Sequence, residues 1–393
     1  MRLTLKPIAR RILGFVGRML SWFSFQHNES GLFFFFRTAD MGGAERVHAQ
    51  IVRCFAHERP WVYFTEAGAG NRFLTEYSAA GRIAQVAWLA QNRVLTYIHA
   101  GFLAGLISRH SNAVVFGSEF GLLYRVIAFL PRTVRCIDLR HSLDPFPEEY
   151  TTRFADRLES RVVISERHAR LRRQIYQTHG CTSEAAKRIV VIENGVPHGR
   201  TDCRDWDSPI LHTLYVGRGS PEKRVHLVGR IASECQRRGL PIRVTIVGPD
   251  ANWVDAADRP FVELTGVIVE PARVRKLYED SHLLLLTSSS EGMPLAVQEA
   301  MACGCVVVCT DCGALAEHID ASRGVVVKNR DDGEVVADIL ASLEALSQDR
   351  ARLREMSGKA FEYAVTRFAA PQFCQQYRDL LRPSPSRNGS ALQ

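Results

Sequence analysis

Two carboxylates, eight residues apart, occupy the start of an expected helix in the C-terminal half of the chain. Glu291 lies in the segment 288–295, which follows an apolar run, and Glu299 lies about two turns further along the helix. Pro294 suits the first turn of a helix, and the free amides of that turn attract anions. Glu299 shares a helix face with apolar residues, so we expect its carboxylate to point towards an apolar interior. There it needs a partner, which either a buried arginine or a pair of ligand hydroxyl groups could supply.

A second charged group follows the expected strand 211–216. Gly217 precedes Arg218, and Lys223 stands where the next helix is expected to begin. A guanidinium grips a pair of oxygens and an ammonium acts as a point charge, so these two cations could converge on one polyanion. Surface ion pairs are the alternative. The glycines do not form a dinucleotide-binding fingerprint, because Glu222 replaces the third glycine.

The N-terminal half has a glycine pair and a histidine at the ends of its own expected strands. Gly42 and Gly43 follow the first strand, where glycine lets the backbone approach a ligand closely, although a simple tight turn would also explain them. His141 follows the expected strand 134–139, at the sheet edge where ligands bind. A solvated histidine is the alternative there.

The elements that must position these residues alternate between strands and helices. Apolar runs such as 33–36 are typical of strands that helices cover on both faces, and the repeated order predicts an α/β fold with parallel sheets. The polar, turn-rich stretch 199–210 predicts a linker between two doubly wound, Rossmann-like domains that face a central cleft. The expected parts are an N-terminal domain over 29–198, a C-terminal domain over 211–365, a helix over 366–381 that could cross back to the N-terminal domain, and a disordered tail over 382–393.

The first 28 residues predict a basic amphipathic helix. The net charge is +8, and five cations precede Glu29, which is the first acidic residue. At about 100° per residue, an apolar face that includes Trp22 and Phe23 opposes a polar one. This pattern is typical of helices on anionic membrane surfaces, and packing on the protein's own body is the alternative. The polar face is expected to hold Lys6, Arg10, Gly14, Gly17, Arg18 and Ser21.

The composition excludes several classes of protein. The 393 residues are 46% hydrophobic and 23% charged, as in soluble globular proteins, and no apolar run approaches the ~18 residues of a spanning helix. The sequence has no basic stripe with interleaved aromatic residues, so nucleic-acid binding is not expected. A secretory signal is not evident, so the ten cysteines are expected to be free thiols in a reducing compartment. Four of them, Cys303, Cys305, Cys309 and Cys312, are expected to be small core residues rather than metal ligands.

Taken together, these motifs resemble one known family, and the resemblance covers about residues 31–380. The matching residues are Gly42-Gly43-Ala44-Glu45, His141, Ser165-Glu166, Ile192-Glu193-Asn194-Gly195-Val196, Gly217-Arg218 with Glu222-Lys223, Thr265-Gly266, Glu291-Gly292-Met293-Pro294 with Glu299, and Gly304. They resemble the retaining GT-B glycosyltransferases of family 4, the group 1 transferases. Two positions depart from the family pattern: Pro197 follows Val196 where the family often has aspartate, and Cys312-Gly313 stands in place of a glycine pair.

The resemblance implies a role for each matching residue. Arg218 and Lys223 would bind the diphosphate of a nucleotide-sugar donor and stabilise its charge as the sugar departs. Glu291 would hold hydroxyl groups of the transferred sugar, and Glu299 would bind the ribose. His141 would contact the sugar near its reacting carbon. The remaining donor-binding residues would be Gly42, Gly43, Gly217, Gly292, Met293, Pro294 and Leu295.

The expected function is transfer of a sugar with retention of configuration, with no metal or other cofactor, to a lipid-linked glycan in bacterial cell-surface polysaccharide assembly. The membrane-surface helix would place this cytoplasmic enzyme on the inner face of the cell membrane, and the chain near residue 198 would act as a hinge. Two alternatives remain open. One is a nucleotide-sugar epimerase of the same fold, and the other is a catalytically silent relative that binds partners at the membrane.

Overall fold

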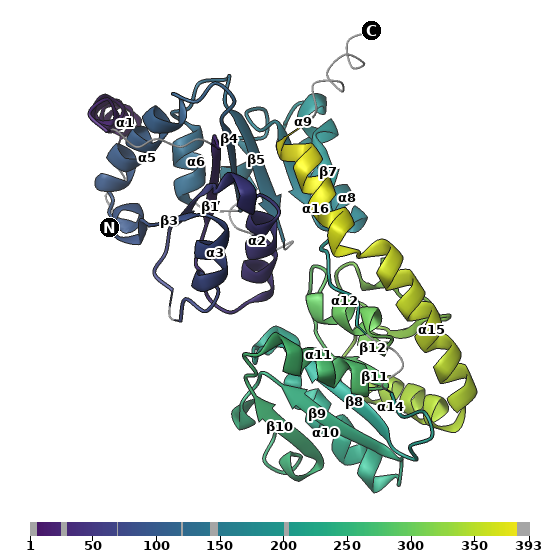
Figure 1. Ribbon diagram of the computed structural model, residues 1–393. Coiled ribbons are helices and arrows are strands. Elements are labelled where there is room, and N and C mark those ends of the chain that lie inside the picture. Colours follow the sequence, from purple (N-terminus) through teal and green to yellow (C-terminus); the bar gives the residue numbers. More distant parts are fainter. Residues whose placement is uncertain are drawn as a thin grey trace. The chain divides into compact units, whose positions relative to one another are not determined.

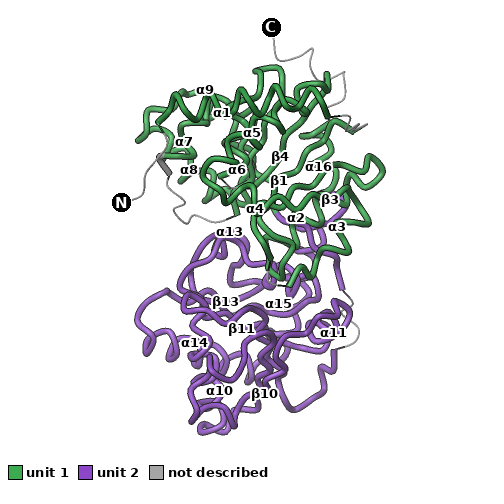
Figure 2. Tube along the Cα trace, turned by 90° about the vertical axis from the view of Figure 1, so that its left-hand side faces the viewer, with its two compact units in different colours: residues 1–193, 374–393 green, residues 194–373 purple. Residues whose placement is uncertain are grey.

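The computed structural model describes residues 6–24, 30–68, 70–118, 121–141, 148–199 and 204–382. The chain divides into two compact units, residues 1–193 with 374–393 and residues 194–373 (Figure 2). Each unit has one parallel sheet flanked by helices, so the predicted α/β class is confirmed (Figure 1). Parts of the expected N-terminal helix, linker and tail lie outside the described residues, namely 1–5, 25–29, 200–203 and 383–393.

The first unit contains seven parallel strands in the order β3-β2-β1-β4-β5-β6-β7. The strands are β1 Leu32–Phe36, β2 Trp61–Phe64, β3 Arg82–Gln85, β4 Val114–Ser118, β5 Arg135–Arg140, β6 Ser160–Val163 and β7 Ile189–Val191. The helices are α1 Pro7–Ser21, α2 Gly43–Arg53, α3 Leu74–Ala80, α4 Ala87–Gln91, α5 Leu95–Ile107, α6 Gly121–Ile127, α7 Glu148–Thr152, α8 Glu166–Thr178 and α9 Ser183–Lys187, with a 3-10 turn, η1, at Ala56–Glu58.

The four phenylalanines of β1 show why this strand is apolar throughout. Phe33 and Phe35 point into the cluster that contains α5 and α6, whereas Phe34 and Phe36 point to the opposite face of the sheet. There they pack against aromatic rings such as Phe55 and His48. Both faces of the strand are therefore buried, as the unbroken apolar run predicts.

The second unit contains six parallel strands in the order β10-β9-β8-β11-β12-β13. The strands are β8 Leu211–Val216, β9 Ile242–Val247, β10 Val262–Gly266, β11 Leu283–Leu286, β12 Val306–Thr310 and β13 Gly324–Val327. The helices are α10 Val225–Arg237, α11 Pro271–Asp280, α12 Leu295–Ala302, α13 Leu315–His318, α14 Asp332–Gln348 and α15 Arg350–Arg367, with 3-10 turns η2 Pro221–Lys223, η3 Ala251–Trp253 and η4 Arg259–Phe261. The last helix, α16, spans Ala370–Leu381 and passes from the second unit into the first.

Arg204 fixes the start of the second unit to its sheet. Arg204 is 5% exposed, and its guanidinium donates to four backbone carbonyls, those of Ser281 at 2.6 Å, Gly304 at 2.9 Å, Cys303 at 2.9 Å and Tyr278 at 3.3 Å. The part of the expected linker that begins at residue 204 is therefore held on the second unit.

Helix α1 packs on α5 with the face that the sequence pattern predicted to be polar. Gly14, Gly17 and Ser21 are buried on that face, and the apolar side chains of the helix are exposed. Glycine counts as polar in a helical pattern, but its lack of a side chain lets two helix backbones touch, so this face can pack against another helix. No helix within the described ranges is long and apolar enough to cross a bilayer.

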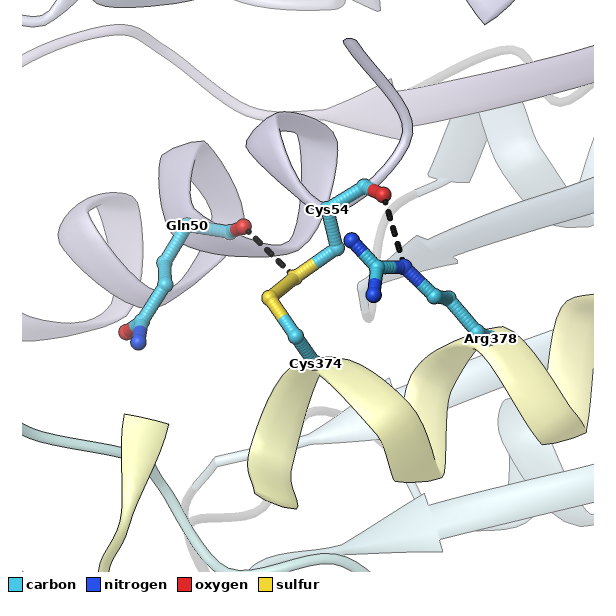
Figure 3. The surroundings of a disulfide bond; sticks show 4 residues. All are labelled: Gln50, Cys54, Cys374 and Arg378. Atoms are coloured by element: carbon cyan, nitrogen blue, oxygen red, sulfur yellow. Dashed lines mark hydrogen bonds between the residues drawn. A yellow bond between two sulfur atoms is a disulfide. The ribbon is translucent and has the colours of Figure 1, made fainter. Parts of the chain in front are cut away.

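One disulfide corrects the expectation that all ten cysteines are free. Cys54, directly after α2, is bonded to Cys374 in α16, and both lie in the first unit (Figure 3). Arg378, one turn further along α16, donates to the Cys54 carbonyl at 3.2 Å. The four cysteines of the segment 303–312 are free and buried in the second unit, as predicted.

Candidate active site

The second unit brings two loops together beside its first strand. The chain runs from β8 to the neighbouring β9 on one side, while β11 pairs with β8 on the other side. The loop 217–224 after β8 and the loop 287–294 after β11 therefore leave the sheet at adjacent strand ends. In doubly wound sheets, ligands bind at the carboxyl ends of the strands where the order reverses in this way.

Lys223 and Glu291 form an ion pair across these two loops. The Lys223 ammonium donates to Glu291 Oε1, and the side chains are only 16% and 10% exposed. The pair is thus largely desolvated, which makes the charges interact more strongly than they would in water. Sequence reasoning placed each residue in the site but did not predict that they bind one another.

Arg218 is oriented differently from Lys223. Its side chain is 76% exposed, and its guanidinium lies 3.5 Å from Glu222 Oε1. Ser220 donates to the same carboxylate oxygen at 2.7 Å, and this hydrogen bond lowers the pKa of Glu222. The structure therefore gives the two expected cations separate partners, and Arg218 is the more accessible one.

Arg224 is a residue that sequence reasoning missed. It has a φ of 46°, in the left-handed region that costs a side-chain-bearing residue energy. Its buried guanidinium donates to the Thr287 carbonyl at 2.7 Å and to Asn329 Oδ1 at 2.7 Å, and the Thr287 hydroxyl lies 3.0 Å from the Lys223 carbonyl. These bonds fasten the loop that carries Lys223 to the loop that carries Glu291. The sequence signal that could have identified Arg224 is its position directly after the expected Lys223.

A third loop, after β12, supports the segment that holds Glu291. Gly313 has a φ of 56°, and a Cβ there would collide with the carbonyl oxygens of Glu291 and Gly292. The Ala314 amide donates to the Gly292 carbonyl at 2.8 Å. Glycine is thus required at position 313, and Cys312, in place of the family's first glycine, is tolerated in a buried position.

The helix α12 carries the rest of the expected donor-binding residues. Pro294 is its N-cap, so Leu295 is its first helical residue, and Met293 before them is buried. Glu299 does not point into the apolar interior as predicted, because it is half-buried and the interior face belongs to other residues of the helix. Tyr278 on α11 donates to Glu299 Oε2 at 3.3 Å. The carboxylate therefore has the Tyr278 hydroxyl as a partner.

In the first unit, the glycine pair opens α2. Gly42 is the N-cap with extended backbone, and Gly43 is the first helical residue. The Glu45 carboxylate lies where a Cβ at Gly42 would be, so the first turn folds over the glycine. Asp40, two residues earlier, accepts hydrogen bonds from the amides of Gly70 at 2.8 Å and Asn71 at 2.9 Å. This loop is therefore tied to its neighbour after β2.

His141 lies at the end of β5, where it contacts a second histidine that sequence reasoning missed. Its Nε2 is 2.8 Å from Nε2 of His48 on α2, and the His48 ring stacks on Phe36. Burial lowers the pKa of His141 to about 4, and burial together with the charge of His141 holds the pKa of His48 well below its ordinary value. Both rings are neutral near pH 7, so one donates and the other accepts. His48 stands five residues after Gly43, and no spacing rule linked it to His141.

The predicted site residues thus fall into two groups, one on each unit. Lys223, Glu291 and the loop glycines 217 and 292 converge in the second unit, with Arg218 and Glu299 on the same loops and helix. Gly42, Gly43 and His141 belong to the first unit, where α2 connects them through His48.

Residues 211–345 match the family model of the glycosyl transferases group 1. Among curated proteins, a D-inositol 3-phosphate glycosyltransferase of Nocardia farcinica is 34% identical over 38% of this chain and 36% of its own length. The putative colanic acid biosynthesis glycosyltransferase WcaL of Escherichia coli is 27% identical over 44% and 45%. A GDP-mannose:cellobiosyl-diphosphopolyprenol alpha-mannosyltransferase of Xanthomonas oryzae is 25% identical over 50% and 54%. The chain therefore spans about one third to one half of these relatives.

Solved structures match over most of the chain. Anabaena Alr3699/HepE in complex with UDP has a TM-score of 0.70 at 16% identity, covering 89% of this chain and 99% of that one. A glycosyltransferase from Rickettsia africae has a TM-score of 0.69 at 14% identity, covering 90% and 99%. At such low identity the likeness shows the fold alone. The segment 211–345 is therefore similar to the glycosyl transferases group 1, and the chain has the GT-B fold.

Proposed function

We propose that this protein is a glycosyltransferase that moves a sugar from a nucleotide-sugar donor to a glycan acceptor. The Lys223–Glu291 pair carries the proposal, because it lies where ligands bind in a doubly wound sheet and within the segment that matches the transferase family. A largely desolvated cation at this place is suited to the leaving diphosphate, which gains negative charge as the sugar departs.

In the proposed mechanism, Lys223 is held in place by Glu291 Oε1 and stabilises the departing diphosphate. The second oxygen of Glu291 accepts a hydrogen bond from a hydroxyl of the transferred sugar. A single carboxylate therefore orients both Lys223 and the sugar. Arg218, with its exposed guanidinium, grips phosphate oxygens through its fork. Glu299, oriented by Tyr278, accepts the two ribose hydroxyls. The two cations supply the charge stabilisation that a divalent metal ion gives in other transferases.

The proposal extends to configuration and acceptor. The sugar is transferred with retention, and the acceptor is a lipid-linked glycan used in cell-surface polysaccharide assembly at the inner face of the membrane. Support comes from relatives whose names refer to colanic acid biosynthesis and to a cellobiosyl-diphosphopolyprenol acceptor.

Calorimetric titration with UDP-, GDP- and ADP-sugars tests the donor site. We expect one nucleotide class to bind, Glu299→Ala to abolish that binding, and Tyr278→Phe to weaken it about fivefold, since one hydrogen bond that orients the carboxylate is lost. Absence of binding for every donor would refute the transferase proposal and favour the catalytically silent alternative.

Product analysis tests the chemistry. Incubation of the bound donor with membrane lipid extract should move label into the butanol-soluble fraction, with an unchanged anomeric coupling constant and no loss of rate in EDTA. Label that appears only as an altered nucleotide sugar, without acceptor, would instead identify an epimerase. Removal of residues 1–27 should reduce transfer to the lipid acceptor but leave donor binding unchanged.

A further inference from the structure

Helix α1 and the turn after it carry the largest group of exposed apolar side chains among the described residues. Eight of the fourteen exposed large apolar side chains in those ranges belong to this short segment. Trp22 and Phe23 are 68% and 80% exposed, and Phe15 is 65% exposed. Contiguous apolar surface of this kind marks a binding face in a soluble protein. The eight residues are Ile8, Ile12, Phe15, Val16, Met19, Leu20, Trp22 and Phe23.

This apolar face cannot turn inward, because α1 is fixed on α5 by the opposite face. A Cβ at Gly17 would collide with the Ile98 carbonyl, and a Cβ at Gly101 would collide with the Gly14 carbonyl. The two helix backbones therefore touch through glycine. Arg109, two residues after the end of α5, donates to the Ser21 carbonyl at the end of α1. It also donates to the Ser24 carbonyl at 2.8 Å.

The charges around this face are all positive in the described part of the segment. On a helical projection, Arg11 lies at one border of the apolar face and Arg18 lies next to it at the edge of the polar face, and both are exposed. Arg10 lies on the packed side, with its guanidinium 5.6 Å from the centre of the Tyr97 ring. No acidic residue occurs between Lys6 and Ser24. Long cationic side chains at the rim of an apolar face can reach phosphate groups while the apolar side chains enter the acyl region.

We propose that α1 is a rigid docking face for an anionic lipid bilayer. The apolar face enters the interface, Arg11 and Arg18 bind lipid phosphates, and the glycine contact with α5 transmits this orientation to the whole first unit. The helix is therefore a fixed face of the first unit and not a flexible tether. This inference deepens the membrane location of the proposed function, and its test uses binding alone, so it can fail without affecting the donor site.

The experiment is flotation of the full chain with vesicles. We expect binding to vesicles with about 30% phosphatidylglycerol and much weaker binding to pure phosphatidylcholine. The reason is that each cation near an anionic surface raises the membrane binding constant about fivefold. The triple variant Phe15→Ser, Trp22→Ser, Phe23→Ser should lose at least about tenfold in partition, because three large apolar side chains are removed. The double variant Arg11→Gln, Arg18→Gln should bind the anionic vesicles less well than the wild type does. Its weak binding to pure phosphatidylcholine should not change.

A matched control is Phe261→Ser, which removes an exposed aromatic ring from the second unit. It should bind vesicles as the wild type does. The triple variant should keep the wild-type unfolding midpoint and donor affinity, because all three side chains are exposed. Vesicle binding unchanged in the triple variant would overturn the proposal. So would a wild-type dimer in lipid-free sedimentation that the triple variant loses, because the apolar face would then bind a second copy of the chain.

Discussion

The Lys223 ammonium donates to Glu291 Oε1, and this ion pair joins the loops that follow the adjacent strands β8 and β11. The two residues are 68 positions apart in the sequence, so the pair exists only because the sheet places the two strands side by side. Arg224, the residue after Lys223, makes a second connection between the same loops. The cation proposed to meet the leaving diphosphate is therefore held in place before any ligand arrives, which favours catalysis by preorganised charge.

Removal of either partner of this pair should destabilise the protein, because the other charge stays largely buried. We expect Lys223→Gln and Glu291→Gln each to lower the free energy of unfolding by about 2 kcal/mol or more, and the double variant to lose less than the sum. Urea denaturation of the four proteins gives this coupling. Lys223→Gln should also lower the rate of sugar transfer about 10²–10³-fold.

The exposed ion pair Lys276–Asp280 is the control for that cycle. Its side chains are 58% and 46% exposed, so its coupling should stay below about 0.5 kcal/mol. Equal coupling in the two cycles, or strictly additive effects at Lys223 and Glu291, would contradict the account of a desolvated pair.

His48 is expected to position His141. In His48→Phe, the new ring can keep the stacking on Phe36 but cannot form the 2.8 Å contact with His141 Nε2. We expect kcat for sugar transfer to fall about fivefold with little change in KM for the donor, the effect of one lost hydrogen bond. The exposed His57→Phe variant serves as control. An increase in KM alone, or identical kinetics, would contradict a positioning role for His48.

Arg204 should be among the most important residues for the stability of the second unit. Arg204→Met keeps most of the side-chain volume but leaves four backbone carbonyls without this donor, so the free energy of unfolding should fall by about 3 kcal/mol or more. The exposed Arg243→Met should change it by less than about 0.5 kcal/mol. Similar urea midpoints for both variants would show that the buried network contributes little.

The disulfide between Cys54 and Cys374 should stabilise the first unit, because it links positions 320 residues apart. We expect the double substitution Cys54→Ser, Cys374→Ser to cost about 2–4 kcal/mol of unfolding free energy. Alkylation of the unfolded chain, followed by mass spectrometry, should label two more cysteines after reduction than before. Cys181→Ser, at a free cysteine, should leave both measurements unchanged apart from the one lost thiol. Full labelling without reductant would show that the bond does not form.

Acid should destabilise the second unit through His282. This residue is fully buried, its Nδ1 accepts the His212 amide at 3.1 Å, and its Nε2 therefore donates to the Asp205 carbonyl. Burial lowers the pKa of His282 to about 4, below its ordinary value of 6.5. Since the unfolded chain binds the proton more readily, stability should decrease as the pH falls from 6.5 towards 4 and then level off. As the pH falls over this range, the urea midpoint should decrease less steeply in His282→Gln than in the wild type. An equal decrease in the two proteins would show that His282 does not cause the loss of stability.

Most of the strands were predictable from the sequence because their physical signals are local. Uninterrupted apolar runs such as 33–36 mark strands covered on both faces, and the glycine and charged motifs at their ends give the sheet edge where ligands bind. No strand was predicted at β10, because it lies at the edge of the sheet, its residues are half-buried or exposed, and its apolar–polar alternation covers only Val262 to Thr265. Edge strands are the ones whose sequence is least constrained by burial.

Three features follow from the order of the residues alone: the α/β class, the location of the charged motifs at strand ends, and the basic, aromatic-rich character of the N-terminal helix. The partners of the site residues and of the cysteines depend on the three-dimensional fold: Lys223 pairs with Glu291, His141 with His48, and Cys54 with Cys374. The fold also decides that α1 packs through Gly14 and Gly17, with its apolar face exposed. The reason is physical. Periodicity and turn chemistry depend on neighbours along the chain, whereas ion pairs, disulfides and helix contacts depend on distances that folding alone creates.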